Sequence, residues 1–219
     1  MNWAKIRAVI FDLDGVILDS VTLKTEIFLR CYDGKLDETQ KAYIREHQAH
    51  HGGVGRAEKF RHFEAFLFGR SLDDEKINGL IRLYQSHLFK HIDDCALLPG
   101  AIECLNLAAN SCDLYLVSGT LHEDLIRIVE KRNLADHFIS IIGSPTTKND
   151  AFATIIKNAD YHPGTVLAIG DSITEYEAAC SCGIHFVGIV APNEPNRFPL
   201  HVPVYKNLLA LTMAWNRSS

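Results

Sequence analysis

Residues 9–20 read VIFDLDGVILDS, a stretch in which a hydrophobic run is followed at once by two aspartates, Asp12 and Asp14. The run from Val9 to Phe11 has the composition of a buried β-strand. Two like charges at the edge of a hydrophobic core repel each other and are costly unless a cation compensates them. The stretch therefore predicts a strand that ends in a polar site with a positive partner.

Similar short hydrophobic runs recur along the chain and alternate with helical patterns. The predicted strands cover residues 6–11, 113–118, 138–143, 165–170 and 185–190, with a last short strand near 202–205. The predicted helices between them cover residues 121–134, 150–159 and 175–183, and a final helix begins at Asn207. This alternation is typical of an α/β fold with a doubly wound parallel sheet that helices cover on both faces.

The alternation is interrupted once, from about residue 22 to residue 95, where only helical patterns occur. Three of them are clear, at residues 36–50, 57–69 and 73–89. So long a helical stretch after the first strand predicts an inserted helical domain. We expect residues 1–18 and 95–219 to form the α/β core and residues 19–94 to form the insertion.

Composition narrows the class of protein. The chain has 219 residues, 22 Lys plus Arg and 27 Asp plus Glu, for a net charge of −5. A basic face for nucleic acid or for an anionic membrane is not expected from this balance. None of the six cysteines forms a CxxC pair, and the sequence shows neither a signal peptide nor a membrane-spanning run. We expect a cytoplasmic protein with free thiols, a monomer or a homodimer.

Polar residues follow four of the predicted strands. In doubly wound sheets ligands bind beyond the carboxyl ends of the strands, so these residues are expected to meet at one edge. They are Asp12 and Asp14 after the first strand, Ser118, Gly119 and Thr120 after the second, Lys148 after the third and Asp171 after the fourth. Three carboxylates, a hydroxyl and an ammonium predict a polar site the size of a phosphate group.

These residue types suit phosphoryl transfer. Asp12 is a nucleophile that a phosphate ester would repel, and Mg²⁺ shared with Asp171 would neutralise the repulsion. Lys148 would supply positive charge to the phosphoryl group, and Ser118 with nearby backbone N–H groups, leading into a helix after Thr120, would hold its other oxygens. Asp14 would give a proton to the leaving oxygen and later take one from water.

The four motifs together resemble those of the haloacid dehalogenase (HAD) superfamily. DLDG at 12–15, VSGT at 117–120, Lys148 and GDSITE at 170–175 occur in the order of that family's motifs, and the match covers residues 6–18 and 95–190. The resemblance implies a Rossmann-like core, an aspartyl-phosphate intermediate and Mg²⁺. The helical insertion resembles the C1 cap of the β-phosphoglucomutase and phosphoglycolate phosphatase branch.

The resemblance also assigns roles residue by residue. Asp12 is similar to the nucleophile, and Asp14 to the general acid/base, whose backbone carbonyl also binds the metal. Ser118, Gly119 and Lys148 resemble the phosphate binders, and Asp171 the remaining metal ligand. One position departs from the pattern, because Glu175 stands where the family often has Asp. We interpret Glu175 as an indirect ligand that acts through water or a neighbouring side chain.

The insertion holds further candidates. His47, His50 and His51 have a spacing that suits either a metal site or a solvated helix end. Gly52, Gly53 and Gly55 form a flexible turn, followed by Arg56 and Lys59 on one helical face, and we expect Arg56 to reach the substrate. Lys24 is expected to face the cleft, where related mutases often have His.

The function expected from the sequence is that of a Mg²⁺-dependent phosphatase acting on a small phosphorylated metabolite, such as a sugar phosphate or a phosphoglycolate-like molecule. A phosphomutase would use the same core, and Lys24 in place of His disfavours it. A haloacid dehalogenase typically lacks the second aspartate, so Asp14 argues against that reaction. A non-catalytic phospho-aspartate switch is opposed by Asp14 and by the helical insertion.

Overall fold

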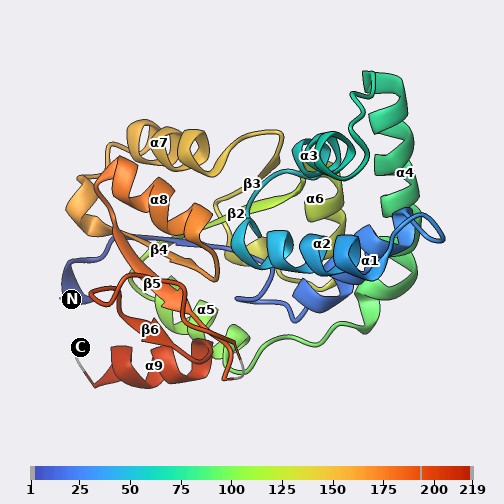
Figure 1. Ribbon diagram of the computed structural model, residues 1–219. Helices are drawn as coiled ribbons and strands as arrows, with labels where there is room; N and C mark the ends of the chain where they lie inside the picture. Colours follow the sequence, from blue (N-terminus) through green and yellow to red (C-terminus); the bar gives the residue numbers. More distant parts are fainter. Residues whose placement is uncertain (1–2, 193, 218–219) are drawn as a thin grey trace.

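The centre of the molecule is one parallel β-sheet (Figure 1). In the computed structural model, which describes residues 3–192 and 194–217, the strand order is β3-β2-β1-β4-β5-β6. The strands are β1 Ala8–Phe11, β2 Asp113–Leu121, β3 Ser140–Ser144, β4 Val166–Gly170, β5 His185–Ile189 and β6 Val204–Tyr205. All their pairings are parallel. The predicted fold is confirmed, and β1 lies between β2 and β4, so the loops after these three strands are neighbours.

Helices cover both faces of the sheet, because the side chains of its central strand β1 point alternately to one face and to the other. Ala8 and Ile10 belong to the hydrophobic core shared with α7 (Lys148–Asn158) and α8 (Ile173–Cys182). Val9 and Phe11 belong to the core on the opposite face. That face is covered by α5 (Ala101–Ala109), α6 (His122–Lys131) and α9 (Leu208–Asn216). A strand buried on both faces requires the continuous hydrophobic run that residues 8–11 provide.

Four helices form the segment between β1 and α5. They are α1 (Val21–Cys31), α2 (Glu38–His50), α3 (Arg56–Phe68) and α4 (Asp74–His91), and they pack on one another beside the sheet (Figure 1). Their shared interior is aromatic, with Phe28 within 4.7–5.6 Å of the rings of Phe60, Phe63 and Tyr84. We call this helical group the cap and propose that it is a domain of residues 19–94, inserted between core segments 1–18 and 95–219.

The chain enters and leaves the cap at adjacent points. The N–H of Asp19 donates to the carbonyl of Ala96 at 3.0 Å, and that of Leu98 donates to Ile17 at 2.8 Å. Two neighbouring crossings of this kind allow the cap to be inserted in the core without disturbing the sheet.

Some element bounds differ from those expected. Strand β2 extends to Leu121, so α6 begins at His122 and not directly after Thr120 as predicted. Helix α7 begins at Lys148, two residues earlier than predicted, because the Thr147 side chain accepts from the N–H of Asp150 and caps the helix. In residues 3–192 and 194–217 no helix is long and apolar enough to cross a membrane.

Candidate active site

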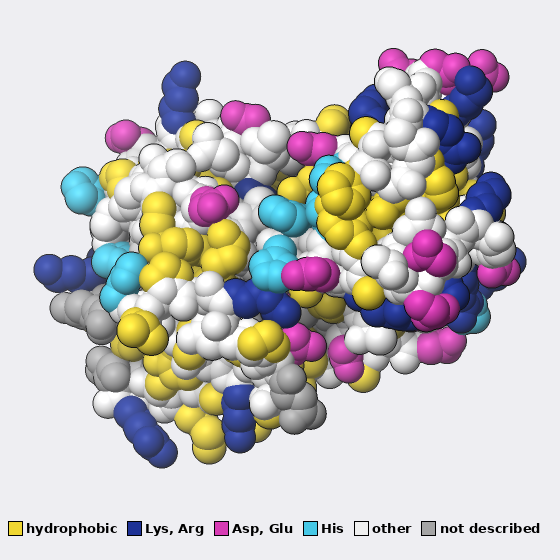
Figure 2. Space-filling model, in the orientation of Figure 1, with side chains coloured by type: hydrophobic (Ala, Val, Ile, Leu, Met, Phe, Trp, Pro, Cys, Tyr) yellow, Lys and Arg dark blue, Asp and Glu magenta, His cyan; other side chains and the backbone are white. Residues whose placement is uncertain are grey.

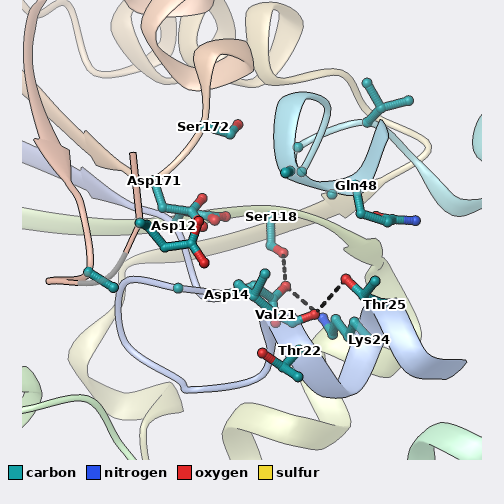
Figure 3. Close-up of a pocket in the computed structure, with 18 of the residues that line it drawn as sticks. Asp12, Asp14, Val21, Thr22, Lys24, Thr25, Gln48, Ser118, Asp171 and Ser172 are labelled. Carbon is teal, nitrogen blue, oxygen red and sulfur yellow. Dashed lines mark hydrogen bonds and ion pairs between the residues drawn. The ribbon is translucent and has the colours of Figure 1, made fainter. Parts of the chain in front are cut away.

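The predicted site residues other than Lys148 line one cavity between the cap and the carboxyl ends of the strands (Figure 3). Its volume is about 490 Å³, a size that admits a small ligand. The core contributes residues from the loops after β1 and β4 and from the carboxyl end of β2, and the cap contributes residues from α1, α2, α3 and α4. Lining residues used below are Asp12, Asp14, Gly15, Lys24, Gln48, Gly52, Gly53, Arg56, Lys59, Tyr84, Ser118, Gly119, Thr120 and Asp171.

Asp12 and Asp171 come together because Gly15 leaves room for them. Gly15 has a φ of +74°, which side-chain-bearing residues rarely adopt. A Cβ atom at this position would overlap the carboxylate of Asp171. Figure 3 shows the side chains of Asp12 and Asp171 next to each other on one side of the cavity. The DLDG turn therefore brings the loop after β1 against the loop after β4.

Lys148 lies beneath Asp12 and is buried with it. Its Nζ donates to Asp12 Oδ1 at 2.6 Å and to the carbonyl of Val117 at 2.7 Å, and lies 2.9 Å from Glu175 Oε1. Glu175 is fixed in turn, because its Oε2 accepts from the N–H of Ser172 at 2.9 Å and from the Ser172 hydroxyl. The first residue of α7 is thus held between two carboxylates from β1 and α8.

This group carries more buried negative charge than Lys148 alone can balance. Burial, opposed by Lys148 and reinforced by Glu175, raises the pKa of Asp12 to about 7. Burial, with the nearby charges of Glu175 and Asp12, raises the pKa of Asp171 well above its usual value. Burial works to lower the pKa of Lys148, but Asp12 and Glu175 outweigh it and the pKa is raised. The site around Asp12 favours a further positive charge.

Asp14 has a different environment. Its carboxylate accepts from Lys24 Nζ at 2.6 Å, from Thr120 Oγ1 at 3.0 Å and from the Ser20 hydroxyl. Burial alone would raise the pKa of Asp14, but Lys24 and these hydrogen bonds hold it below its usual value. Asp14 is therefore a carboxylate whose side chain is directed to the cap helix α1. The predicted position of Lys24 at the cleft agrees with this geometry.

Ser118 and Gly119 lie near the carboxyl end of β2, where they line the cavity. The Ser118 hydroxyl accepts from the N–H of Thr120 at 3.1 Å and lies 3.4 Å from Asp14 Oδ2. A Cβ atom at Gly119 would come within 2.6 Å of the carbonyl oxygen of Gly53. Gly119 therefore permits the cap loop to lie directly on this strand end, next to the Ser118 hydroxyl.

Arg56 lines the cavity but already has a partner. Its Nη1 donates to Asp124 Oδ2 on α6 at 2.8 Å, and its guanidinium lies 4.1 Å from the centre of the Tyr84 ring. Both charged side chains are buried, with 7% and 3% of their surface exposed. The contact with substrate predicted for Arg56 stays a prediction, and the ion pair with Asp124 is a contact that the sequence did not reveal.

The cap histidines lie side by side at the end of α2. The rings of His47 and His51 are 4.6 Å apart, and the ring of His62 on α3 lies 4.4 Å from His47. Figure 2 shows histidine side chains gathered where this end of α2 meets the core. Burial, with the charges of His51 and His62, lowers the pKa of His47 to about 4. His47 is therefore uncharged at neutral pH and packs against the rings of His51 and His62.

The donors near Asp12 suit a hard divalent cation. Within residues 3–192 and 194–217, no three side chains of His, Cys, Asp or Glu are close enough to hold a metal ion together. The side chain of Asp14 is directed to Lys24 and Thr120, so the carboxylates available to a metal are those of Asp12 and Asp171. Oxygen donors with excess negative charge fit Mg²⁺, which keeps several waters as additional ligands.

This fold and arrangement of carboxylates define the class of the protein. The model of the haloacid dehalogenase-like hydrolase family matches residues 9–189, so the chain belongs to that family. A curated relative from Bacillus subtilis (strain 168), "Putative phosphatase YhcW", is 27% identical over 201 residues, and the match covers 86% of this chain and 84% of that protein.

Solved structures share the fold at lower identity. CbbY from Rhodobacter sphaeroides, in complex with phosphate, is 15% identical with a TM-score of 0.75 over 94% of this chain and 96% of that one. The HAD-hydrolase YfnB from Bacillus subtilis, bound to magnesium, is 20% identical with a TM-score of 0.67 over 96% and 99% of the two chains. At such identities the likeness concerns the fold alone.

Proposed function

We propose that this protein is a Mg²⁺-dependent phosphatase that hydrolyses a small phosphorylated metabolite through an aspartyl-phosphate on Asp12. The observation that carries the proposal is the position of Asp12 at the cavity, bound to Lys148 at 2.6 Å and adjacent to Asp171. Lys148 orients Asp12 and opposes the rise that burial causes in its pKa, and the adjacent Ser118 hydroxyl and the Gly119 backbone are available to phosphoryl oxygens.

Asp12, Asp171 and the backbone carbonyl of Asp14 would hold Mg²⁺, which when bound neutralises charge on the attacking carboxylate and on the phosphate. The magnesium in YfnB and the phosphate in CbbY, two proteins of the same fold, are consistent with this expectation.

Asp14 is suited to activate the water of the second step. Its carboxylate form, which Lys24, Thr120 and Ser20 stabilise, is the form that takes a proton from water. To donate a proton to the leaving oxygen in the first step, Asp14 must be protonated in the substrate complex. A bound phosphate dianion would favour protonation by raising the pKa of Asp14.

The alternative with the same chemistry is a phosphomutase, in which the phosphoryl group returns to the product. The residue that donates to Asp14 is Lys24, at a position where related mutases often have His, and this difference supports a phosphatase. A sugar bisphosphate added as activator distinguishes the two functions, because it would accelerate isomerisation by a mutase and would not be required by a phosphatase.

The test is phosphate release from a panel of phosphorylated metabolites, with Mg²⁺ and with a chelator. We expect Mg²⁺-dependent release that Asp12→Asn abolishes while the thermal unfolding temperature changes little. Asp136→Asn, at an exposed position of the core, is the matched control and should retain full activity. Activity of Asp12→Asn equal to that of the wild type would refute the proposal.

A further inference from the structure

Lys59 is a buried ammonium without an acidic partner. It lies on α3 and lines the cavity, and its side chain is 4% exposed. Its Nζ donates to Gln48 Oε1 at 2.7 Å and to the carbonyl of Gly52 at 3.1 Å, and lies 5.7 Å from the centre of the Phe28 ring. All three neighbours are uncharged, so nothing among them balances the positive charge.

The other cations that line the cavity each have a carboxylate. Lys24 is paired with Asp14 at 2.6 Å, and Arg56 with Asp124 at 2.8 Å. At the rim, the corresponding pairs are Arg45 with Glu26 at 3.4 Å and Arg197 with Glu194 at 3.7 Å. Among the described residues that line the cavity, Lys59 is therefore the cation that remains available for an anionic ligand.

Gln48 beside it has an unused donor. An ammonium group only donates hydrogen bonds, so the amide oxygen of Gln48 must face Lys59 and the NH₂ group must face away. Gln48 is 7% exposed, and its Nε2 has no hydrogen-bond partner among the described residues. Leaving a buried amide donor unpaired is costly, and this cost accompanies the orientation that keeps the Gln48 oxygen on Lys59.

Burying the Lys59 ammonium without a carboxylate partner makes its protonation less favourable. Burial, reinforced by the charge of Lys24, lowers the pKa of Lys59 to about 7. The charged form of Lys59 is favoured by the carboxylates of Asp14, Asp171 and Glu175, but their effect on its pKa is smaller than that of burial. A bound anion would restore the charge and would itself be held by a bond of the stronger, charge-assisted kind.

We propose that Lys59, positioned by Gln48, binds a second anionic group on the leaving-group part of the substrate, either a carboxylate or a second phosphate. Figure 3 shows Gln48 across the cavity from Asp12 and Asp171, so this subsite is separate from the position of the reacting phosphoryl group. The inference rests on the proposed phosphatase function and narrows its substrates to phosphate esters with a further acidic group.

The experiment compares esters that differ in one group. 3-Phosphoglycerate is compared with glycerol 3-phosphate, and 1,3-propanediol bisphosphate with 3-hydroxypropyl phosphate, in turnover by the wild type and in equilibrium binding by Asp12→Asn. We expect the doubly acidic member of at least one pair to be preferred about tenfold or more, as for a charged hydrogen bond. The pair that shows the preference identifies a carboxylate or a second phosphate as the bound group.

The variant Lys59→Met keeps the aliphatic stem and removes the charge. It should lose the preference through a higher KM for the doubly acidic ester and change kcat/KM for the ester without the second acidic group by less than about threefold. Gln48→Met should also reduce the preference for the doubly acidic ester. Lys76→Met, at a side chain on α4 that is 66% exposed, should change the turnover of neither ester.

Equal binding and turnover within both pairs in the wild type would overturn the inference, and so would a Lys59→Met variant that retains the preference or loses both esters equally. These results leave Asp12-dependent phosphate release untouched. Failure of the phosphatase function would show instead as turnover that survives Asp12→Asn, and binding by that variant would still report on Lys59.

Discussion

The ammonium of Lys148 lies between two carboxylates, 2.6 Å from Asp12 and 2.9 Å from Glu175, and all three side chains are almost fully buried. A buried charge pair contributes little net stability over a hydrophobic replacement, but the loss of one partner leaves the other uncompensated. The sequence predicted Lys148 near the phosphate because it follows a strand. Its second partner, Glu175, is fixed by the capping of α8. The resemblance to the family's motifs indicated Glu175 only as an indirect ligand.

Lys148→Met should destabilise the protein by about 3 kcal/mol or more, since it leaves Asp12 and Glu175 buried without their cation. Urea unfolding at neutral pH without divalent cations measures this loss. The exposed Lys157 on the same helix is the matched control, and Lys157→Met should stay within about 0.5 kcal/mol of the wild type. A free energy of unfolding unchanged by Lys148→Met would show that the carboxylates do not need Lys148.

At the scale of elements, the loop between α2 and α3 lies across the ends of three strands. A Cβ atom at Gly53 would come within 2.5 Å of Glu175 Oε1, and one at Gly55 within 2.7 Å of the Ser144 hydroxyl. Gly119 on β2 contacts the same loop, because a Cβ atom there would come within 2.6 Å of the carbonyl oxygen of Gly53. The sequence indicated a flexible turn here from its glycines, whereas the structure gives them a second reason, which is close contact between loop and core.

Gly53→Ala should lower kcat/KM about tenfold or more, because its methyl group displaces the loop from Glu175 and Thr174. Steady-state kinetics of phosphate release measures the effect. Gly79→Ala is the control, since the nearest atom to its Cβ is 3.9 Å away, and it should stabilise α4 by about 0.5–1 kcal/mol without altering kcat/KM. Unchanged kinetics in Gly53→Ala would contradict this role of the loop.

The contact of α2 with α3 should depend on acid pH through His47. The pKa of His47 is about 4 in the folded protein, below its ordinary value of 6.5, so the unfolded chain binds more protons between these values. Stability should therefore fall as pH decreases from about 6.5 to 4. His51, His62, Lys59 and His50 surround His47 and all oppose its charge.

His47→Phe should remove on the order of 1–2 kcal/mol of this decrease, a value discounted because the side chain is only half buried. Thermal or urea unfolding at pH 6.5 and 4 measures the difference, with the exposed His162→Phe as control. An equally steep decrease in His47→Phe would assign the acid sensitivity to other groups.

At the scale of the whole molecule, Asp124 joins the cap to the core. Its carboxylate on α6 accepts from Arg56 on α3 at 2.8 Å and from Gln85 on α4 at 2.8 Å. The two partners of the ion pair are 68 residues apart in sequence, and no local pattern links them. Strand ends, in contrast, are brought together by sheet topology, which is why Asp12, Asp14, Ser118 and Asp171 could be predicted and this link could not.

Asp124→Leu and Arg56→Met should each destabilise the protein by about 3 kcal/mol or more, because each leaves the other charge buried and unpaired. The double variant should be markedly more stable than the sum of the two losses predicts, and a double-mutant cycle of urea unfolding measures this coupling. Additive losses would show that the two charges do not stabilise the link between cap and core.

The central claim is that Asp12 accepts the phosphoryl group, and trapping the covalent intermediate tests it most directly. Asp14→Asn, which lacks the base for hydrolysis, is incubated with Mg²⁺ and p-nitrophenyl phosphate, whose leaving group needs no proton from Asp14, then quenched in acid and analysed by mass spectrometry of its peptides. We predict one phosphoryl group on the peptide that contains Asp12, and none in the double variant with Asp12→Asn. Phosphate release by Asp14→Asn without such an adduct, or an adduct at another residue, would contradict the account.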